Sequence, residues 1–128
     1  MSKKNNKQSI SQSEAKILNI LWDDFPLDGK QIAEKLKTTS WSFVTIKTLI
    51  NRLLNKGFLS YEKEGRRYLY QSTISKKQYL KSENKQFLDR MYGGSISGLF
   101  ASFSDHEKMS KDELEEIKSI ISQMENDL

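Results

Sequence analysis

Apolar residues recur at helical spacing in the segment between Ser42 and Gly57, and this pattern predicts one amphipathic helix. They fall at positions i, i+3, i+4, i+7 and i+8, so they form a single stripe that faces a core. The stripe consists of Ile46, Leu49, Ile50, Leu53 and Leu54. Ser42 is suited to cap the free amides of the first turn, and Gly57 suits the left-handed residue that follows a helix. We therefore expect a helix from Ser42 to Asn55 with one buried face.

The opposite face of this helix carries side chains that are typical of a DNA-binding surface. Hydroxyl and amide groups can hydrogen-bond to base edges in the major groove, an aliphatic group can contact a thymine methyl, and long cations can reach guanine or phosphate. The candidate DNA-contacting residues on this helix are Val44, Thr45, Lys47, Thr48, Asn51 and Arg52. An ordinary solvated helix face has a similar composition, so the neighbouring elements decide between the two interpretations.

Two shorter helices are predicted before this helix. The first begins at the capping-box spacing of Ser11 and Glu14, and Pro26 stops it. The second runs from about Asp28 to Lys37, with Asp28 as its cap. Both carry apolar residues at helical spacing, so each is expected to bury one face.

A β-hairpin is predicted directly after the long helix, in residues 58–70. Polar and apolar side chains alternate on both sides of a turn at Glu64-Gly65. Three helices followed by a two-stranded hairpin, the wing, predict a winged helix-turn-helix. A charged hairpin tip is often only solvated, but cations beside a recognition helix can bind the phosphates that flank the groove. The candidate phosphate-binding residues of the wing are Lys63, Arg66 and Arg67.

The remaining part of the chain predicts three further helices. A capping-box spacing at Ser75 and Gln78 opens the first, Gly93-Gly94 ends it, and Ser110 opens the last. So short a segment has too little interior to bury all its apolar stripes, and exposed stripes usually contact a partner. The residues expected at this interface are Phe87, Leu88, Met91, Leu99, Phe100, Leu114, Ile117, Ile121 and Met124.

We expect this partner to be a second copy of the chain, because a two-fold dimer places two recognition helices on two half-sites. The alternative is that the three helices pack back onto the winged helix as one core. The predicted organisation is a flexible basic leader (1–9), a winged-helix DNA-binding domain (10–73) and a three-helix dimerisation region (74–128). The fold class is mainly α with a small β-hairpin wing.

The distribution of charge agrees with this organisation. The chain of 128 residues carries 21 Lys and Arg against 17 Asp and Glu, a net charge of +4. Residues 1–72 carry a net charge of +6, and residues 73–128 a net charge of −2. A basic first part and a slightly acidic second part are typical of a nucleic-acid-binding domain followed by a protein-contact region.

Several function classes are disfavoured by composition. The chain has no cysteine, so it has neither a disulfide framework nor a thiolate metal site, and we expect no metal and no cofactor. No apolar run approaches the roughly 20 residues that span a bilayer, so we expect no membrane contact and a cytoplasmic protein. Nucleophile, base and oxyanion groups do not cluster, so we do not expect an enzyme.

Several segments together have the sequence of a known family. They include Leu18-Asn19-Ile20-Leu21-Trp22, Trp41-Ser42, Thr45-Ile46-Lys47-Thr48-Leu49-Ile50, Lys56-Gly57, Glu62-Lys63-Glu64-Gly65-Arg66-Arg67-Tyr68 and Glu113-Leu114-Glu115-Glu116-Ile117. The chain resembles the BlaI/MecI/CopY family of penicillinase, methicillin-resistance and copper-transport repressors over nearly its whole length. The resemblance implies a homodimeric repressor on inverted-repeat operator DNA, with DNA contacts on the helix and wing residues named above. Phe43 stands where that family commonly has proline, and Ala15 where it commonly has tryptophan.

The resemblance also implies that the repressor controls antibiotic-resistance or metal-homeostasis genes, and it implies how the repressor is released from DNA. Copper-responsive members end in a paired Cys-x-Cys motif, which this chain lacks. Antibiotic-responsive members are released from DNA by a regulatory protease that cuts an Asn-Phe bond, and the nearest match here is Ser102-Phe103. Phe103 is also the fourth residue of an apolar helical stripe, and we favour that interpretation. The competing function is a winged-helix protein-interaction adaptor without sequence-specific DNA binding.

Overall fold

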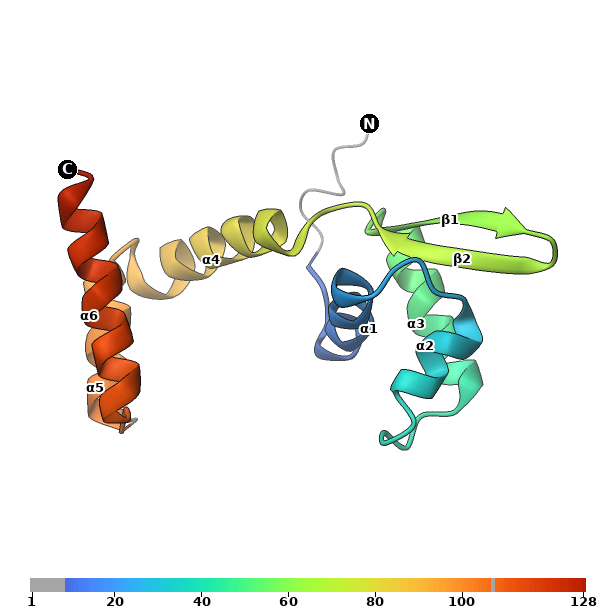
Figure 1. Ribbon diagram of the computed structural model, residues 1–128, viewed down its shortest axis with the longest axis horizontal. Coiled ribbons are helices and arrows are strands. Elements are labelled where there is room, and N and C mark those ends of the chain that lie inside the picture. The colour runs from blue at the N-terminus through green and yellow to red at the C-terminus, as the bar shows by residue number, and fades with distance from the viewer. Residues whose placement is uncertain (1–8, 107) are drawn as a thin grey trace. The chain divides into compact units, whose positions relative to one another are not determined.

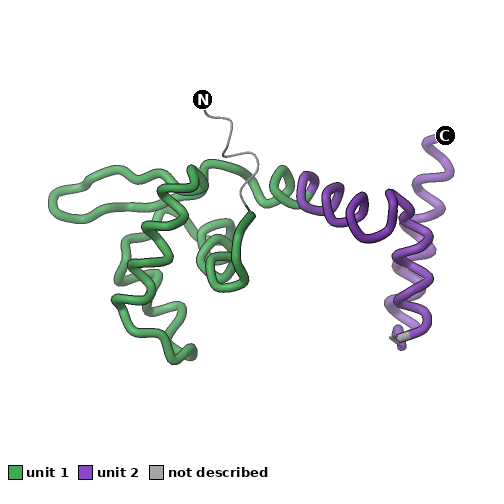
Figure 2. Tube along the Cα trace, turned by 180° about the vertical axis from the view of Figure 1, so that it is seen from behind, with its two compact units in different colours: residues 1–80 green, residues 81–128 purple. Residues whose placement is uncertain are grey.

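The computed structural model describes residues 9–106 and 108–128, except for the side chain of His106 (Figure 1). Residues 1–8 of the predicted leader therefore lie outside the described residues. The helices and strands are α1 (Gln12–Asp23), α2 (Gly29–Lys35), α3 (Phe43–Asn55), β1 (Leu59–Glu64), β2 (Arg67–Ser72), α4 (Lys76–Tyr92), α5 (Ile96–His106) and α6 (Lys111–Asn126). The predicted class, mainly α with a β-hairpin, is confirmed. The chain divides into two compact units, residues 1–80 and 81–128 (Figure 2).

The predicted N-cap residues are observed, and they determine where the first three helices begin. The hydroxyl of Ser11 accepts from the Glu14 amide (3.1 Å), and the Glu14 carboxylate accepts from the Ser11 amide (2.9 Å). The same reciprocal pair joins Asp28 and Gln31 at the start of α2 (2.8 Å each). At the start of α3 the Ser42 hydroxyl accepts from the amide three residues on. Each side chain satisfies an amide that has no partner within its own helix.

The core of the first unit lies between α1, α2, α3 and the root of the hairpin. The α3 stripe faces it as predicted: four of its five residues are buried, and Leu54 is half-buried against them. The other buried apolar residues are Ile17, Leu18, Leu21, Leu27, Ile32, Leu36, Leu59 and Tyr70. α3 is thus held by its inner face, and its outer face is left to solvent.

The hairpin is antiparallel, and its register differs by one residue from the prediction. Glu64 pairs with Arg67, so the turn consists of Gly65 and Arg66 rather than Glu64 and Gly65. Gly65 has a φ of 64°, a conformation that glycine adopts at no steric cost, and a two-residue turn needs it at its first position. The backbone of Leu27 also pairs with that of Tyr70 (2.8 and 3.1 Å), which ties the root of the wing to the segment before α2.

None of the second unit's residues whose burial the structure describes is buried. Among the residues that the structure describes, every buried one lies between Glu14 and Tyr70. Local contacts order the helices: Gly93 and Gly94, with φ of 57° and 85°, end α4, and the Ser110 hydroxyl caps α6. Residues 81–128 therefore present most of their apolar side chains to solvent.

Candidate nucleic-acid interface

The outer face of α3 is exposed along its whole length. Five of the six predicted contact residues on this helix are exposed, with Val44 at 73%, and Lys47 is half-buried. Because successive residues are turned by about 100° around a helix, Lys47 lies at one edge of this face, while Thr45 and Arg52 lie at the other. The face is wide enough to present side chains to both walls of a groove.

The two threonine hydroxyls on this face are already partly engaged. Thr48 donates to the Val44 carbonyl (3.0 Å), so its hydroxyl oxygen is left as an acceptor. Thr45 accepts from the Ser42 hydroxyl (3.2 Å), so its own proton remains free to donate. The two side chains therefore offer opposite hydrogen-bonding functions on one face, which is the kind of difference that distinguishes base edges in a major groove.

The wing carries a stack of tyrosines that sequence reasoning missed. The rings of Tyr61 and Tyr68 are 4.6 Å apart at an interplanar angle of 14°, and the Lys63 ammonium lies 5.6 Å from the Tyr68 ring centroid. The strand register places all three side chains on one face of the hairpin, the face that begins with the buried Leu59 and Tyr70 at its root. Alternation in the sequence was the signal that could have identified this aromatic face.

The two wing arginines have different surroundings. Within the described part of the chain, Arg66 makes no hydrogen bond or ion pair. Arg67 is engaged at each of its nitrogens: Nε donates to Asp28 Oδ2 (2.9 Å), and the other two contact Glu64 (3.2 Å) and Gln31 (3.5 Å). The exposed fraction of the Asp28 side chain is only 18%, against 48% for Arg67.

The charge of Asp28 is stabilised in this arrangement. The backbone amide of Gln31 and the guanidinium of Arg67 hold the pKa of the Asp28 carboxyl below its ordinary value, although partial burial acts in the opposite direction. Asp28 is therefore an anion that both caps α2 and pairs with the wing.

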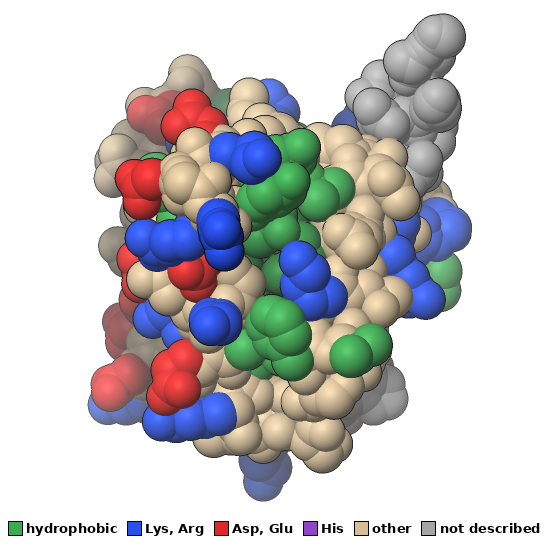
Figure 3. Space-filling model, turned by 90° about the vertical axis from the view of Figure 1, so that its right-hand side faces the viewer, with side chains coloured by type: hydrophobic (Ala, Val, Ile, Leu, Met, Phe, Trp, Pro, Cys, Tyr) green, Lys and Arg blue, Asp and Glu red, His purple; other side chains and the backbone are tan. Residues whose placement is uncertain are grey.

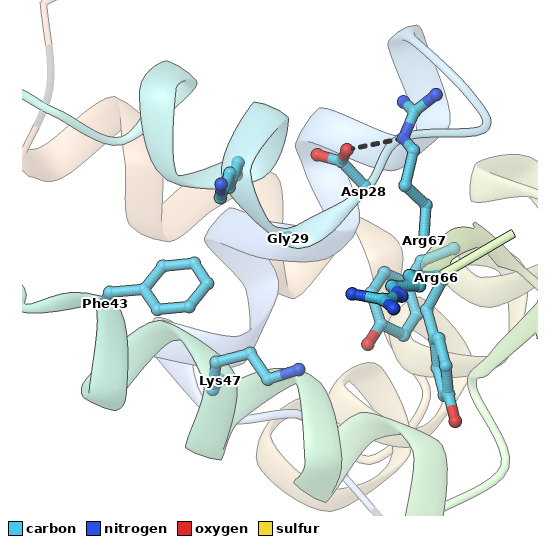
Figure 4. A pocket seen from close by; sticks show the side chains of 9 residues that line it. Asp28, Gly29, Phe43, Lys47, Arg66 and Arg67 are labelled. Atoms are coloured by element: carbon cyan, nitrogen blue, oxygen red, sulfur yellow. Dashed lines mark hydrogen bonds and ion pairs between the residues drawn. The ribbon is translucent and has the colours of Figure 1, made fainter.

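An open hollow lies between the start of α2, the start of α3 and the wing (Figure 4). Figure 4 shows the Lys47 and Arg66 side chains pointing into the same space, with the Asp28–Arg67 pair at its side. The hollow measures about 560 Å³, and its lining comprises Asp28, Gly29, Lys30, Phe43, Lys47, Arg66, Arg67, Tyr68 and Tyr70. On the face drawn in Figure 3, Lys and Arg side chains lie beside and between the side chains of a hydrophobic patch, and Asp and Glu side chains lie farther to the left. The cations that line the hollow suit the phosphates of a nucleic acid.

The predicted interface residues lie on α4, α5 and α6. Leu114, Ile121 and Met124 are exposed, and Ile117 is half-buried. Phe87, Met91 and Phe100 are exposed, whereas Leu88 and Leu99 are half-buried. Ile120, which the sequence analysis left out, is 58% exposed and extends the α6 stripe by one position around the helix.

The candidate cleavage site lies inside a helix. Ser102 and Phe103 belong to α5, where the Ser102 hydroxyl is 3.1 Å from the Tyr92 hydroxyl and Phe103 is 45% exposed. Phe103 and Phe100 also border a hollow between α5 and α6. These contacts agree with a structural role for Phe103.

Two further observations concern metal sites and membrane-spanning helices. No three aspartate or glutamate side chains in residues 9–105 and 108–128 come together as metal ligands would. In the same ranges, no helix combines the length and the apolar character that crossing a bilayer requires.

Comparison with known proteins places the chain. A family profile described as Penicillinase repressor matches residues 10–123. The chain belongs to the penicillinase repressor family. It is 30% identical to the penicillinase repressor of Bacillus licheniformis, over 91% of this chain and 92% of that one. It is 31% identical to the methicillin resistance regulatory protein MecI of Staphylococcus aureus, over 91% of this chain and 96% of that one.

The winged-helix part of this family member has a solved relative. The solution structure of the DNA-binding domain of the repressor BlaI is 33% identical, with a TM-score of 0.51, over 56% of this chain and 88% of that one. The winged-helix fold that the sequence predicted is therefore confirmed, and the resemblance to the repressor family with it.

Proposed function

We propose that this protein is a transcriptional repressor that binds inverted-repeat operator DNA as a homodimer. α3 enters the major groove, and the wing lies against the flanking phosphates. The observation that carries the proposal is the outer face of α3. Its polar side chains are exposed to solvent, while the opposite face of the helix is packed into the core. A buried stripe and a free polar face are what a recognition helix needs.

The relatives support this assignment. Those at 30% and 31% identity are named as a penicillinase repressor and a methicillin resistance regulatory protein, and the solved relative is the DNA-binding domain of a repressor. Genes of antibiotic resistance are accordingly the proposed targets. The contact residues on α3 and the wing remain predictions that only DNA-binding measurements test.

The proposed dimer is supported by the lack of burial in residues 81–105 and 108–128, where no residue is buried. A segment of this size with so little burial has no core to stabilise it, and association with a second copy supplies one. The apolar stripe on α6, which includes Ile117, Ile120 and Ile121, is the proposed centre of the interface.

The family resemblance alone supports release by a regulatory protease at Ser102-Phe103, whereas the contacts of Phe103 within α5 support the structural role that we favour. Because this bond lies within α5, a protease must first unwind that helix locally. Replacing Phe103 by a residue that the protease does not accept should then leave the repressor bound to its operator after the inducer is added.

The experiment that tests the function begins with fragments of the source genome. Bound fragments are selected with the full-length protein, and their affinity is measured by fluorescence anisotropy at several salt concentrations. A repressor enriches an inverted repeat, and its affinity falls steeply with salt because counterions are released from phosphates. An interaction adaptor enriches no sequence and shows no such salt dependence, which would refute the proposal.

A further inference from the structure

We propose that Arg67 is a positioning residue that fixes the wing, and that Arg66 alone of the two wing arginines contacts phosphate. This inference rests on the proposed function, since it assigns roles within the same DNA-binding surface. It also departs from the sequence-based expectation, which treated the two neighbouring arginines as equivalent phosphate ligands.

The first argument is that the guanidinium of Arg67 is already occupied by hydrogen bonds within the protein. All three nitrogens of its guanidinium are engaged, with Asp28, Glu64 and Gln31 as acceptors. A phosphate could reach this group only by displacing one of these acceptors, of which the nearest, Asp28, is a mostly buried anion. Arg66, in contrast, has no partner within the described residues and points into the hollow (Figure 4).

The second step is that Asp28 belongs to the helix-turn-helix and not to the wing. Its other carboxylate oxygen caps α2, and the residue before it, Leu27, is paired through its backbone with Tyr70 of β2. The wing is therefore attached to the start of α2 at two points, by backbone at Tyr70 and by side chain at Arg67. The side-chain attachment is the one nearer the tip.

The third step connects this attachment to α3. Phe43 and Lys47 of α3 pack over Gly29, the residue after Asp28: a Cβ atom at Gly29 would lie 3.5 Å from Phe43 Cζ and 3.8 Å from Lys47 Cδ. The Arg67–Asp28 pair therefore sets the spacing between Arg66 on the wing and Lys47 on α3, two cations that have no hydrogen-bond or ion-pair partner among the described residues. Two cations at a fixed spacing bind a phosphate backbone with less loss of conformational freedom than two mobile ones.

The test is a cycle of variants of the full-length protein on a mixed-sequence DNA duplex of 30 base pairs. Phosphate contacts dominate binding to such a probe, so no operator needs to be known. Each lost contact lowers the magnitude of the slope of log K against log salt by about 0.9. The variants are R66A, R67A and R66A/R67A, with R90A on α4 as the matched loss of an exposed arginine outside the proposed surface.

We expect R66A to lower the magnitude of this slope by about 0.9, and R66A/R67A to lower the magnitude no further. R67A alone lowers the magnitude of the slope by at most the same amount, because its only expected effect is to misplace Arg66 and so weaken the phosphate contact of Arg66. A double variant whose slope falls in magnitude by about 1.8 would show that Arg67 itself binds phosphate and would overturn the proposal, since independent contacts add. An unchanged slope in R66A would also overturn it. If the wild-type protein itself failed to bind the duplex, the proposed function would fall together with this assignment.

A second measurement shows whether a variant loosens only the wing or unfolds the whole winged-helix unit. D28N keeps a side chain that caps α2 well but removes the anion that pairs with Arg67. Amide hydrogen exchange of β1 and β2 should be faster in both R67A and D28N than in wild type, while exchange in α1 and α3 stays unchanged. Equal protection of the wing in all three proteins would show that the pair does not hold it.

Discussion

The Glu14 carboxylate and the Lys56 ammonium lie 2.7 Å apart, and together they join the start of α1 to the end of α3. Only 1% of Glu14 is exposed, and its carboxylate also accepts from the Ser11 amide. Lys56 donates in addition to the Ser9 carbonyl (3.0 Å). The proposed recognition helix α3 is thus fixed at its C-terminal end, and among the described residues its N-terminal half, where base contacts are expected, makes no such ion pair.

The first prediction is that Glu14→Gln destabilises the winged helix by about 1–2 kcal/mol at neutral pH, because weaker hydrogen bonds to a neutral amide replace the charge-assisted bonds of the buried carboxylate. Burial raises the pKa of Glu14, but the hydrogen bonds from Lys56 and Ser11 outweigh it and hold the pKa below the ordinary 4.5. On acidification the unfolded chain therefore takes up the proton first. The contribution is complete above pH 4.5 and is lost as pH falls through the lower folded-state value.

Urea unfolding between pH 2 and pH 8 measures this effect. The difference between wild type and E14Q should shrink below about pH 4.5. As a control, Glu34→Gln removes an exposed carboxylate that pairs with Lys37, and it should change stability little. A wild-type and E14Q pair whose stabilities differed by the same amount at every pH would contradict the assignment.

The second prediction concerns base recognition by α3. Asn51→Ala should cost about 1–3 kcal/mol on the operator and relax the preference at one base pair, because an amide can form two hydrogen bonds with a base edge. Thr48→Ala should also change the preference among sequences. Its effect should be smaller, since its hydroxyl is left mainly as an acceptor. Competition binding against operators changed at single positions measures both, and a uniform loss on every sequence would show that the side chain contacts the backbone instead.

The third prediction is that Ile117→Asp with Ile121→Asp produces a monomer that no longer binds the operator. A carboxylate in an apolar interface loses its hydration without gaining a partner. Ser119→Asp, on the opposite side of α6, is the matched control and should remain dimeric. Sedimentation equilibrium distinguishes the two. If the double variant sedimented as a dimer, the interface would lie elsewhere, with α4 the next candidate.

The fourth prediction is that zinc and copper ions do not release the protein from its operator. The chain has no thiolate, and the carboxylates that surround its helices are poor ligands for a soft cation. Titration of each ion into the protein–DNA complex, followed by gel shift, tests this. Stoichiometric release would require a metal site that the described residues do not show.

The parts of the fold that the sequence predicted well are those fixed by neighbouring residues. The caps at Ser11, Asp28, Ser42 and Ser110 act over three residues, so their spacing is visible in the sequence. The predicted turn of the wing is wrong by one residue. The sequence does not decide between Glu64-Gly65 and Gly65-Arg66, because both place the glycine inside a two-residue turn. The strand register, which depends on pairing along the whole hairpin, decides between them.

The side-chain pairs that organise the site could not be predicted in the same way. Asp28 and Arg67 are 39 positions apart, and Glu14 and Lys56 are 42 apart. Several other acidic residues were equally available to each cation in the sequence. Only the packing of α1, α2 and the hairpin on α3 brings these particular partners within reach. The candidate contact residues on α3 were accessible to prediction because helical periodicity alone separates a buried face from a free one.

None of the described residues of 81–128 is buried, and a dimer built on this segment would make the protein responsive to its own abundance. If a second copy supplies the missing core, the free energy that orders these helices grows with the logarithm of protein concentration. At low copy number the segment around α5 should then unwind more often, which exposes Ser102-Phe103 to proteolysis when little repressor is present. Dilution and cleavage would reinforce each other, so that a modest fall in repressor level is converted into a sharper loss of repression.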